Sequence, residues 1–136
     1  MIALLSVPLP VLALDSREIL WADCPDRLSC RKDTTSRSRI CLEFKREKGQ
    51  CRAGGMVGGE HISTVRVRAG QGAWFLVLFK KINGTPEHWI QGRGIQVHYI
   101  GNGQTWVKTG DGFFDIRVSA HPYGEFSLFV KQLAPK

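Results

Sequence analysis

Hydrophobic and polar residues alternate along most of the chain from residue 63 to residue 131. This period of two places every second side chain on the same face of a β-strand. The pattern is clearest over residues 106–118, where two alternating runs flank the turn signal Gly110-Asp111-Gly112. The second run places three hydrophobic side chains on one face: Phe114, Ile116 and Val118. We therefore predict a β-hairpin over 106–118, within one antiparallel β domain.

Similar runs on both sides of this hairpin predict further short strands. They cover residues 39–44, 63–68, 73–80, 89–90, 95–100, 105–108 and 126–131. Turn or loop signals separate them at residues 54–59, 69–72, 83–84, 92–94, 101–103 and 121–124. The run 73–80 is apolar on both faces, which is typical of a central strand covered on two sides. About seven to eight short strands with regular turns favour an all-β fold, an antiparallel β-sandwich.

The chain before residue 63 divides into two parts. Residues 1–14 carry no charge and are mostly apolar, and they are shorter than the roughly 20 residues that a membrane span needs. They are interpreted either as a signal peptide, with small residues suited to cleavage after Ala13, or as an N-terminal extended segment packed on the domain. Residues 15–62 are a basic, cysteine-containing segment, and residues 63–136 are the β-sandwich core of what is a single domain overall.

Four cysteines lie in the basic segment: Cys24, Cys30, Cys41 and Cys51. An even number of clustered cysteines in a chain with a candidate signal peptide predicts two disulfides, and three pairings are compatible with the sequence. Zinc is the competing interpretation, but the intervals of five, ten and nine residues match none of the close-paired spacings of zinc modules. We therefore expect a disulfide-stapled segment rather than a metal site.

The formal net charge is +7, so the surface should attract acidic partners. Much of the positive charge lies between Arg27 and Arg52, where nine lysines and arginines stand against three acidic residues. Candidate partners are nucleic acid, acidic lipid headgroups, acidic polysaccharide or an acidic protein. A basic face that only keeps the protein soluble is the alternative.

No motif for catalysis is present, and the serine-nucleophile pattern Gly-x-Ser-x-Gly is missing. A carboxylate pair for glycoside hydrolysis could be drawn from Glu87, Asp111, Asp115 and Glu125. The turn position of Asp111 and the strand position of Asp115 both have ordinary structural explanations. The histidines are scattered over separate predicted turns and strands: His61, His88, His98 and His121. We expect no enzymatic activity, no cofactor and no metal.

Aromatic residues are the stronger candidates for ligand binding. Trp106 and Trp89 lie near predicted turns, with Lys108 close to Trp106, while Tyr99 lies on a predicted strand. Trp74 lies in the predicted central strand, where burial in the core is the simpler expectation. Exposed rings could stack on the apolar face of a sugar, or on nucleobases whose phosphates are held by lysine and arginine.

The sequence also contains the sequon Asn83-Gly84-Thr85, which makes Asn83 a candidate glycosylation site. Pro86 follows the sequon directly and should lower its use.

Segments between about Phe44 and Leu133 resemble the C-terminal, carbohydrate-binding domain of expansins, which also occurs alone in the group 2/3 grass pollen allergens. The matching segments are Phe44–Cys51 with the glycines that follow, Val65-x-Val67, Trp74–Lys80 leading to Asn83-Gly84, Val97-x-Tyr99 with Asn102-Gly103 and Trp106-Val107, and Pro122–Val130. The resemblance implies a non-hydrolytic sandwich that binds cell-wall polysaccharide through a row of surface aromatics. By position it implies Trp106 as one such ring, with Trp74 or Phe75 as a further candidate.

We therefore expect a secreted, basic β-sandwich that binds a ligand rather than catalysing a reaction, with cell-wall polysaccharide as the main hypothesis. The alternative is a secreted protein-interaction factor, such as an inhibitor, effector or toxin, acting through the basic segment between Arg27 and Arg52. Nucleic-acid binding is the least favoured hypothesis, and the oligomeric state stays open.

Overall fold

The computed structural model describes residues 20–24, 39–44, 49–59 and 61–133. These residues form eight β-strands. The strands are β1 (Leu20–Asp23), β2 (Arg39–Glu43), β3 (Gln50–Gly58), β4 (Ser63–Arg68), β5 (Trp74–Gln91), β6 (Gln96–Gly101), β7 (Gln104–Lys108) and β8 (Phe113–Leu133). The prediction of an all-β, antiparallel fold with about seven to eight strands is confirmed, with the exception that β2 pairs with β4 in parallel. In the described part of the chain, no helix has the length and apolarity needed to cross a membrane.

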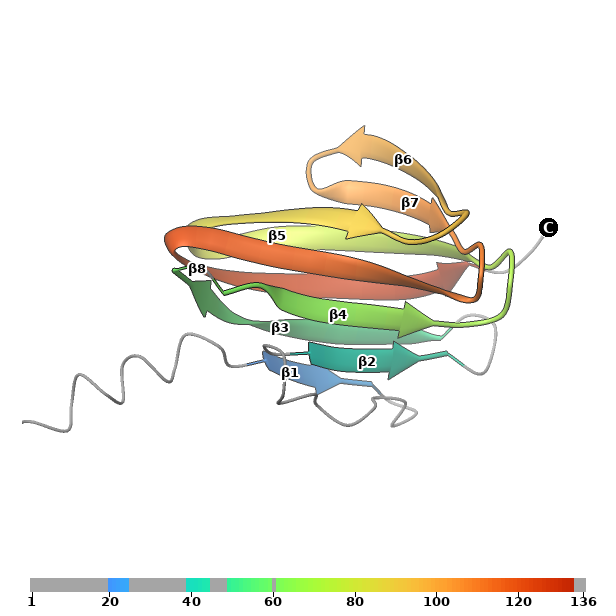
Figure 1. The fold of residues 1–136 in the computed structure, drawn as a ribbon, viewed down its shortest axis with the longest axis horizontal. Helices are drawn as coiled ribbons and strands as arrows, with labels where there is room; N and C mark the ends of the chain where they lie inside the picture. The colour runs from blue at the N-terminus through green and yellow to red at the C-terminus, as the bar shows by residue number, and fades with distance from the viewer. Residues whose placement is uncertain (1–19, 25–38, 45–48, 60, 134–136) are drawn as a thin grey trace, which may run out of the picture.

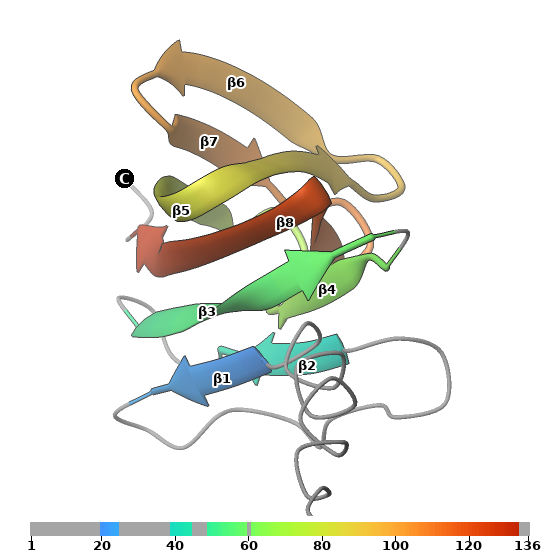
Figure 2. The ribbon, with the colours of Figure 1, turned by 90° about the vertical axis from the view of Figure 1, so that its left-hand side faces the viewer.

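Two strands are much longer than the predicted short strands, and they organise the fold. β5 has 18 residues and β8 has 21, and the two pair from Trp74↔Leu133 to Gln91↔Asp115. Figure 1 shows both strands bending at the left-hand end, so that one half of each lies at the front of the molecule and the other half at the back. All eight strands therefore belong to one hydrogen-bonded sheet that is folded over into two layers (Figure 2).

Each layer contains half of each long strand. In the first layer the strand order is β6-β7-β5-β8-β3-β1, and β8 pairs with β3 from Tyr123 to Lys131. In the second layer the other halves of β5 and β8 continue to β4 and then β2, and β8 pairs with β4 from Phe113 to Val118. The hairpin of β6 and β7 extends the first layer alone (Figures 1 and 2).

The hydrophobic core lies between the two layers. Phe75 in the first layer contacts Phe114 in the second, with ring centroids 5.5 Å apart, and Phe44 after β2 lies 5.0 Å from Phe75. Alternate residues of β8 are fully buried along both halves, including Ile116 and Leu128. Burial of each such side chain contributes about 1.5–3 kcal/mol to the free energy of folding. The alternating hydrophobic residues therefore stabilise the fold by packing between the two layers.

The bend between the layers depends on glycine. Gly84 in β5 has a φ of +72°, and a Cβ added to it would collide with the carbonyl oxygen of Tyr123 in β8. A Cβ at Gly124 would lie 2.8 Å from the Cβ atoms of both Ala120 and Pro86. The two strands can therefore come this close only where side chains are missing.

The prediction of a hairpin over 106–118 is wrong. β7 pairs with β5 and β6, whereas β8 begins in the other layer and pairs with β4 and β5. Residues 109–112 thus connect the two layers. The Thr109 hydroxyl holds this connection, because it accepts a hydrogen bond from the Ala73 N–H (3.0 Å) and donates one to the Gly70 carbonyl (2.8 Å).

Three predicted breaks are also part of strands. The expected loop over residues 54–59 is strand β3 as far as Gly58, because glycine at 54 leaves room for the Trp21 ring and the Phe126 carbonyl oxygen. The turn signals at residues 83–84 and 121–124 lie inside β5 and β8, at the bend. Like a turn, the bend needs residues without a bulky side chain. The glycines therefore mark a change of direction correctly, but the strands continue through it instead of ending there.

The run 73–80 is covered on one face rather than two. Phe75, Val77 and Phe79 are buried in the core, while Trp74, Leu76 and Leu78 are only half-buried. The outer face of this central strand therefore carries apolar side chains that no other described element covers completely.

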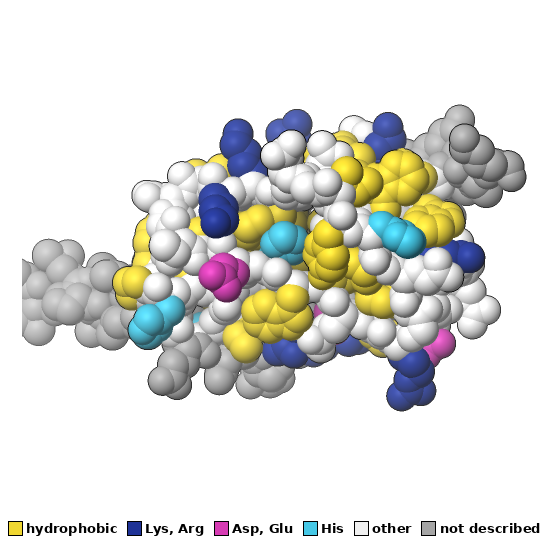
Figure 3. Space-filling view, turned by 90° about the horizontal axis from the view of Figure 1, so that it is seen from above, with side chains coloured by type: hydrophobic (Ala, Val, Ile, Leu, Met, Phe, Trp, Pro, Cys, Tyr) yellow, Lys and Arg dark blue, Asp and Glu magenta, His cyan; other side chains and the backbone are white. Residues whose placement is uncertain are grey.

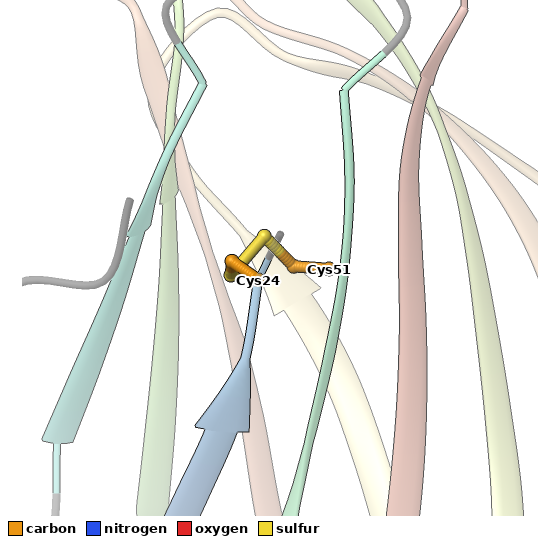
Figure 4. Close-up of a disulfide and its surroundings, with 2 residues drawn as sticks. All are labelled: Cys24 and Cys51. Atoms are coloured by element: carbon orange, nitrogen blue, oxygen red, sulfur yellow. A yellow bond between two sulfur atoms is a disulfide. The ribbon is translucent and has the colours of Figure 1, made fainter. Parts of the chain in front are cut away.

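A disulfide joins Cys24, just after β1, to Cys51 in β3, with the two Cα atoms 4.4 Å apart (Figure 4). If two disulfides form, the second must join Cys30 to Cys41. Cys41 is buried in β2, and Cys30 lies outside the described residues. The candidate signal at residues 1–14 also lies outside them.

We predict that Gly84→Ala lowers the free energy of unfolding by about 1–3 kcal/mol, because a left-handed backbone and a blocked carbonyl approach both oppose a side chain there. Gly70→Ala is the matched control, since its Cβ would meet nothing within 4 Å. Urea denaturation of both variants measures the difference. Equal stabilities for the two variants would contradict the role assigned to Gly84.

Candidate functional site

An aromatic cluster lies on the outer face of the first layer. It consists of Trp74 in β5, His98 in β6, and Trp106 and Lys108 in β7, and we call it the aromatic face. Strand register assembles it, because Trp74 lies opposite Lys108 while Trp106 lies opposite both Leu76 and His98. Neighbouring strands in register bring such side chains within contact distance.

The members of the aromatic face contact one another directly. The Trp74 ring stacks on the His98 ring with centroids 5.9 Å apart, and it meets the Trp106 ring edge-on at 6.4 Å. The Lys108 Nζ lies 5.9 Å from the centre of the Trp74 ring. These contacts hold the rings in place, yet Trp106 remains 42% exposed. The face is thus an ordered aromatic surface open to a partner.

Half-buried apolar side chains extend the aromatic face across β5 and β8. Leu76 and Leu78 lie beside it on β5, and Phe129 lies opposite Leu78 on β8. Exposed Lys80 and Lys131 occupy the same outer face. Figure 3, which looks down on the β6–β7 side, shows hydrophobic and histidine side chains together, with more lysine and arginine than acidic side chains around them. The surface therefore combines aromatic rings with positive charge.

Three of the five predicted ligand-binding residues meet on this face: Trp74, Trp106 and Lys108. Tyr99 does not, because it lies on the opposite side of β6 from His98, where it is 65% exposed. Trp89 lies in the second layer, where its ring Nε1–H donates to the Gln91 carboxamide oxygen (3.0 Å). The prediction of Trp74 as a core residue is corrected to a half-buried surface position.

Sequence reasoning missed His98 as part of the surface. The histidine lies at an alternating position of the predicted strand 95–100, which was the available signal. His98 in β6 meets Trp74 in β5 because β7 pairs with both strands. The two residues are 24 positions apart, and the sequence pattern does not indicate which distant strands pair.

The second layer carries a charged outer face instead. Asp115 accepts two hydrogen bonds from Arg66, at 2.8 and 3.0 Å, and the Arg66 guanidinium also lies 4.2 Å from the centre of the Phe113 ring. Hydrogen bonding to Asp115 raises the pKa of Arg66. Asp115 is thus committed to a structural ion pair. Among the residues that the structure describes, no three or more His, Cys, Asp or Glu side chains group as metal ligands.

A pocket of about 530 Å³ opens below the β6–β7 turn, between the layers. It is lined by Phe79, Lys81, Pro86, Glu87, His88 and Gly103. The His88 ring stacks on Phe79 with centroids 4.1 Å apart, and its Nε2 atom is buried with no hydrogen-bond partner among the described residues. Burial lowers the pKa of His88 below the ordinary value of 6.5.

The candidate glycosylation site lies at the bend. Asn83 is exposed, and its side-chain oxygen accepts a hydrogen bond from the Gly84 N–H (2.9 Å). The Thr85 hydroxyl donates to the His121 carbonyl (3.2 Å). Glycosylation of Asn83 stays a prediction.

No family model and no curated protein matches the sequence. The fold is similar to the crystal structure of PliG from Salmonella Typhimurium, a periplasmic lysozyme inhibitor of g-type lysozyme, with a TM-score of 0.53 and 18% identity over 69% of this chain and 96% of that chain. A PliG mutant from Escherichia coli matches with a TM-score of 0.50 and 17% identity over 68% and 95% of the two chains. PliG from Aeromonas hydrophila gives 0.49 and 15% over 69% and 98%. At such identities the similarity establishes a shared fold.

These matches correct two expectations. The resemblance to the expansin C-terminal domain is wrong, because the fold is that of PliG, and the quoted motifs were alternating strands and glycine turns that many β proteins share. Cell-wall polysaccharide binding, which that resemblance suggested, is overturned with it. The expectation of a non-catalytic protein agrees with the matched proteins, which are described as inhibitors.

We predict that His88→Phe makes the protein more resistant to mild acid. The folded state holds the pKa of His88 below 6.5, so its contribution to stability is full above the unfolded pKa and is lost as pH falls through 6.5 toward the folded pKa. Phenylalanine keeps the contact with Phe79 and removes the buried, unpaired nitrogen. The stability difference between variant and wild type, measured by urea denaturation, should grow as pH falls below 6.5. A difference that stays constant with pH would contradict the assignment.

Proposed function

We propose that this chain inhibits a lysozyme by binding to it outside the cytoplasm. The observation that carries the proposal is the fold similarity to PliG, which spans 96% of the Salmonella protein. The Cys24–Cys51 disulfide supports an oxidising compartment, since disulfides are rare in the cytosol. This function corresponds to the sequence-based alternative of a secreted protein-interaction factor, with an enzyme as the partner.

Charge complementarity also favours a glycan-cleaving enzyme as the partner. Lysozymes and most other glycosidases place a pair of carboxyl groups in their substrate cleft. A chain with a net charge of +7 is suited to approach such an acidic cleft, because complementary charges steer association and raise the association rate. Residues 25–38 and 45–48, which hold much of that charge, lie outside the described residues, so their part in binding stays a prediction.

The aromatic face is the contact surface that we propose for the partner. Tryptophan side chains dominate the energetics of protein interfaces, and Trp106 combines high exposure with neighbours that hold it in one orientation. Ordered rings lose little conformational entropy on binding. Lys108 and Lys131 supply positive charge at the same surface.

The first test is direct inhibition. The purified chain should reduce the rate at which a g-type lysozyme lyses a peptidoglycan suspension, reaching full inhibition near equimolar ratio if binding is tight. A c-type lysozyme assayed in parallel measures specificity between lysozyme classes. Undiminished lysis at a large excess of the chain, together with no complex on gel filtration, would contradict the proposed function.

The second test addresses the contact surface. We predict that Trp106→Ala weakens binding to the inhibited lysozyme at least tenfold, about 1.4 kcal/mol, because truncation removes an exposed ring at the centre of the surface. Trp89→Ala is the matched control, since Trp89 lies in the other layer beside Arg117. Isothermal titration calorimetry measures both. If the wild type inhibits lysozyme but both variants lose the same binding affinity, the proposed function would stand and the aromatic face would not be the contact surface.

A further inference from the structure

In the part of the chain that the structure describes, exposed large hydrophobic side chains are concentrated on one hairpin. Among the described residues, five large hydrophobic side chains are exposed, and three of them lie on β6 and β7. These three are Tyr99 (65% exposed), Ile100 (56%) and Trp106 (42%). Tyr99 and Ile100 are neighbours near the end of β6, where its register with β7 shifts. This end of β6 is therefore apolar and open.

β6 is also an edge strand. It ends the strand order of the first layer and pairs with β7 alone in the described part of the chain. Figures 1 and 2 show β6 at the top of the sheet, with no described strand beyond it. An edge strand presents a row of backbone N–H and C=O groups that can pair with another strand.

The β6 edge carries neither the charged residues nor the proline that commonly block such pairing. Residues 94–107 contain no Asp, Glu, Lys, Arg or Pro, although the whole chain carries a net charge of +7. Other strands with an edge open in the described sheet do carry such residues: Asp23 in β1, Arg39 and Glu43 in β2, and Pro86 and Glu87 in the second half of β5. Charged residues and proline on edges are the usual protection against unwanted pairing. The edge of β6 is thus the exception in this sheet.

We propose that β6 pairs in antiparallel orientation with β6 of a second copy of this chain. A two-fold axis perpendicular to the sheet would place β6 opposite β6 of the second copy. The same side chains then face each other across the interface, so the strand must not carry charges that would repel their counterparts. An uncharged strand meets this condition because no like charges face each other. At other surfaces the net positive charge of each copy would oppose contact between two copies. An acidic partner would find no positive side chain on β6 to attract it, so a second copy is the better candidate for this edge.

This arrangement would continue the first layer from one copy into the other. Neighbouring strands of one sheet keep the same faces on the same side, so both aromatic faces would lie on one side of the joined sheet. The pairing uses the backbone edge of β6 and leaves the Trp106 ring open. The inference therefore goes beyond the proposed inhibition and does not depend on it. Six residues on each strand make a small interface, so the dimer should be reversible and depend on concentration.

Two isoleucines provide a matched pair of variants. Ile100 lies on the proposed interface and is 56% exposed, while Ile82 lies in β5 and is 49% exposed. Ile100→Lys would place a charge on each copy at the proposed interface, whereas Ile82→Lys makes the same chemical change away from β6. Surface substitutions of this kind change the free energy of unfolding by about 0.5 kcal/mol or less, so both variants should fold.

The measurement is sedimentation velocity from micromolar to submillimolar concentration. Wild type and Ile82→Lys should shift from the monomer mass to twice that mass as concentration rises, while Ile100→Lys should stay monomeric. Hydrogen exchange on wild type should show backbone amides of β6 gaining protection at the higher concentrations. A wild type that remains monomeric throughout would overturn the proposal. So would a dimer that Ile100→Lys forms equally well, one that Ile82→Lys disrupts equally, or β6 amides that become protected only when lysozyme is added.

Discussion

The fold depends on the close backbone approach at the bend of β5 and β8. There Gly84 lies against the carbonyl of Tyr123, and Gly124 lies between Ala120 and Pro86. Without this approach the two longest strands would form a straight ladder whose hydrophobic face had nothing to pack against. Because they bend together, one sheet supplies both layers of its own core. β3, β4 and β7 pair with one half of β8 or β5, and β1, β2 and β6 pair with those three strands.

The same bend determines which surface is open. Folding the sheet buries the inner faces where the two layers overlap, and Phe75 and Phe114 meet there across the core. It leaves the outer face of the first layer open, even though Trp74 and Leu76 on that face are apolar. These side chains would stabilise the protein more if they were buried than they do in contact with water. The contact that we propose with a partner would cover these side chains.

The tertiary structure overturned the resemblance to an expansin domain but is compatible with the binding protein that charge and cysteines indicated. Alternating strands and glycine turns resembled an expansin domain, but such motifs describe β structure in general and carry little information on strand order. The order β6-β7-β5-β8-β3-β1 decides the fold, and that fold is similar to the fold of PliG. The positive charge and the clustered cysteines indicated a secreted binding protein without reference to strand order. Those properties are independent of topology, and the proposed inhibitor retains them.

The sequence by itself determined the all-β class, most strand positions and the buried residues of β8, because a period of two in side-chain polarity is a local property of the chain. It also marked Trp106 and Lys108 as candidates. Only the tertiary structure decided that β7 leaves β8 and joins β5, so that Trp74 and His98 complete the aromatic face. It also decided that the glycines at the bend continue strands instead of ending them. Pairing between distant strands depends on packing across the whole domain, and a local pattern does not encode that packing.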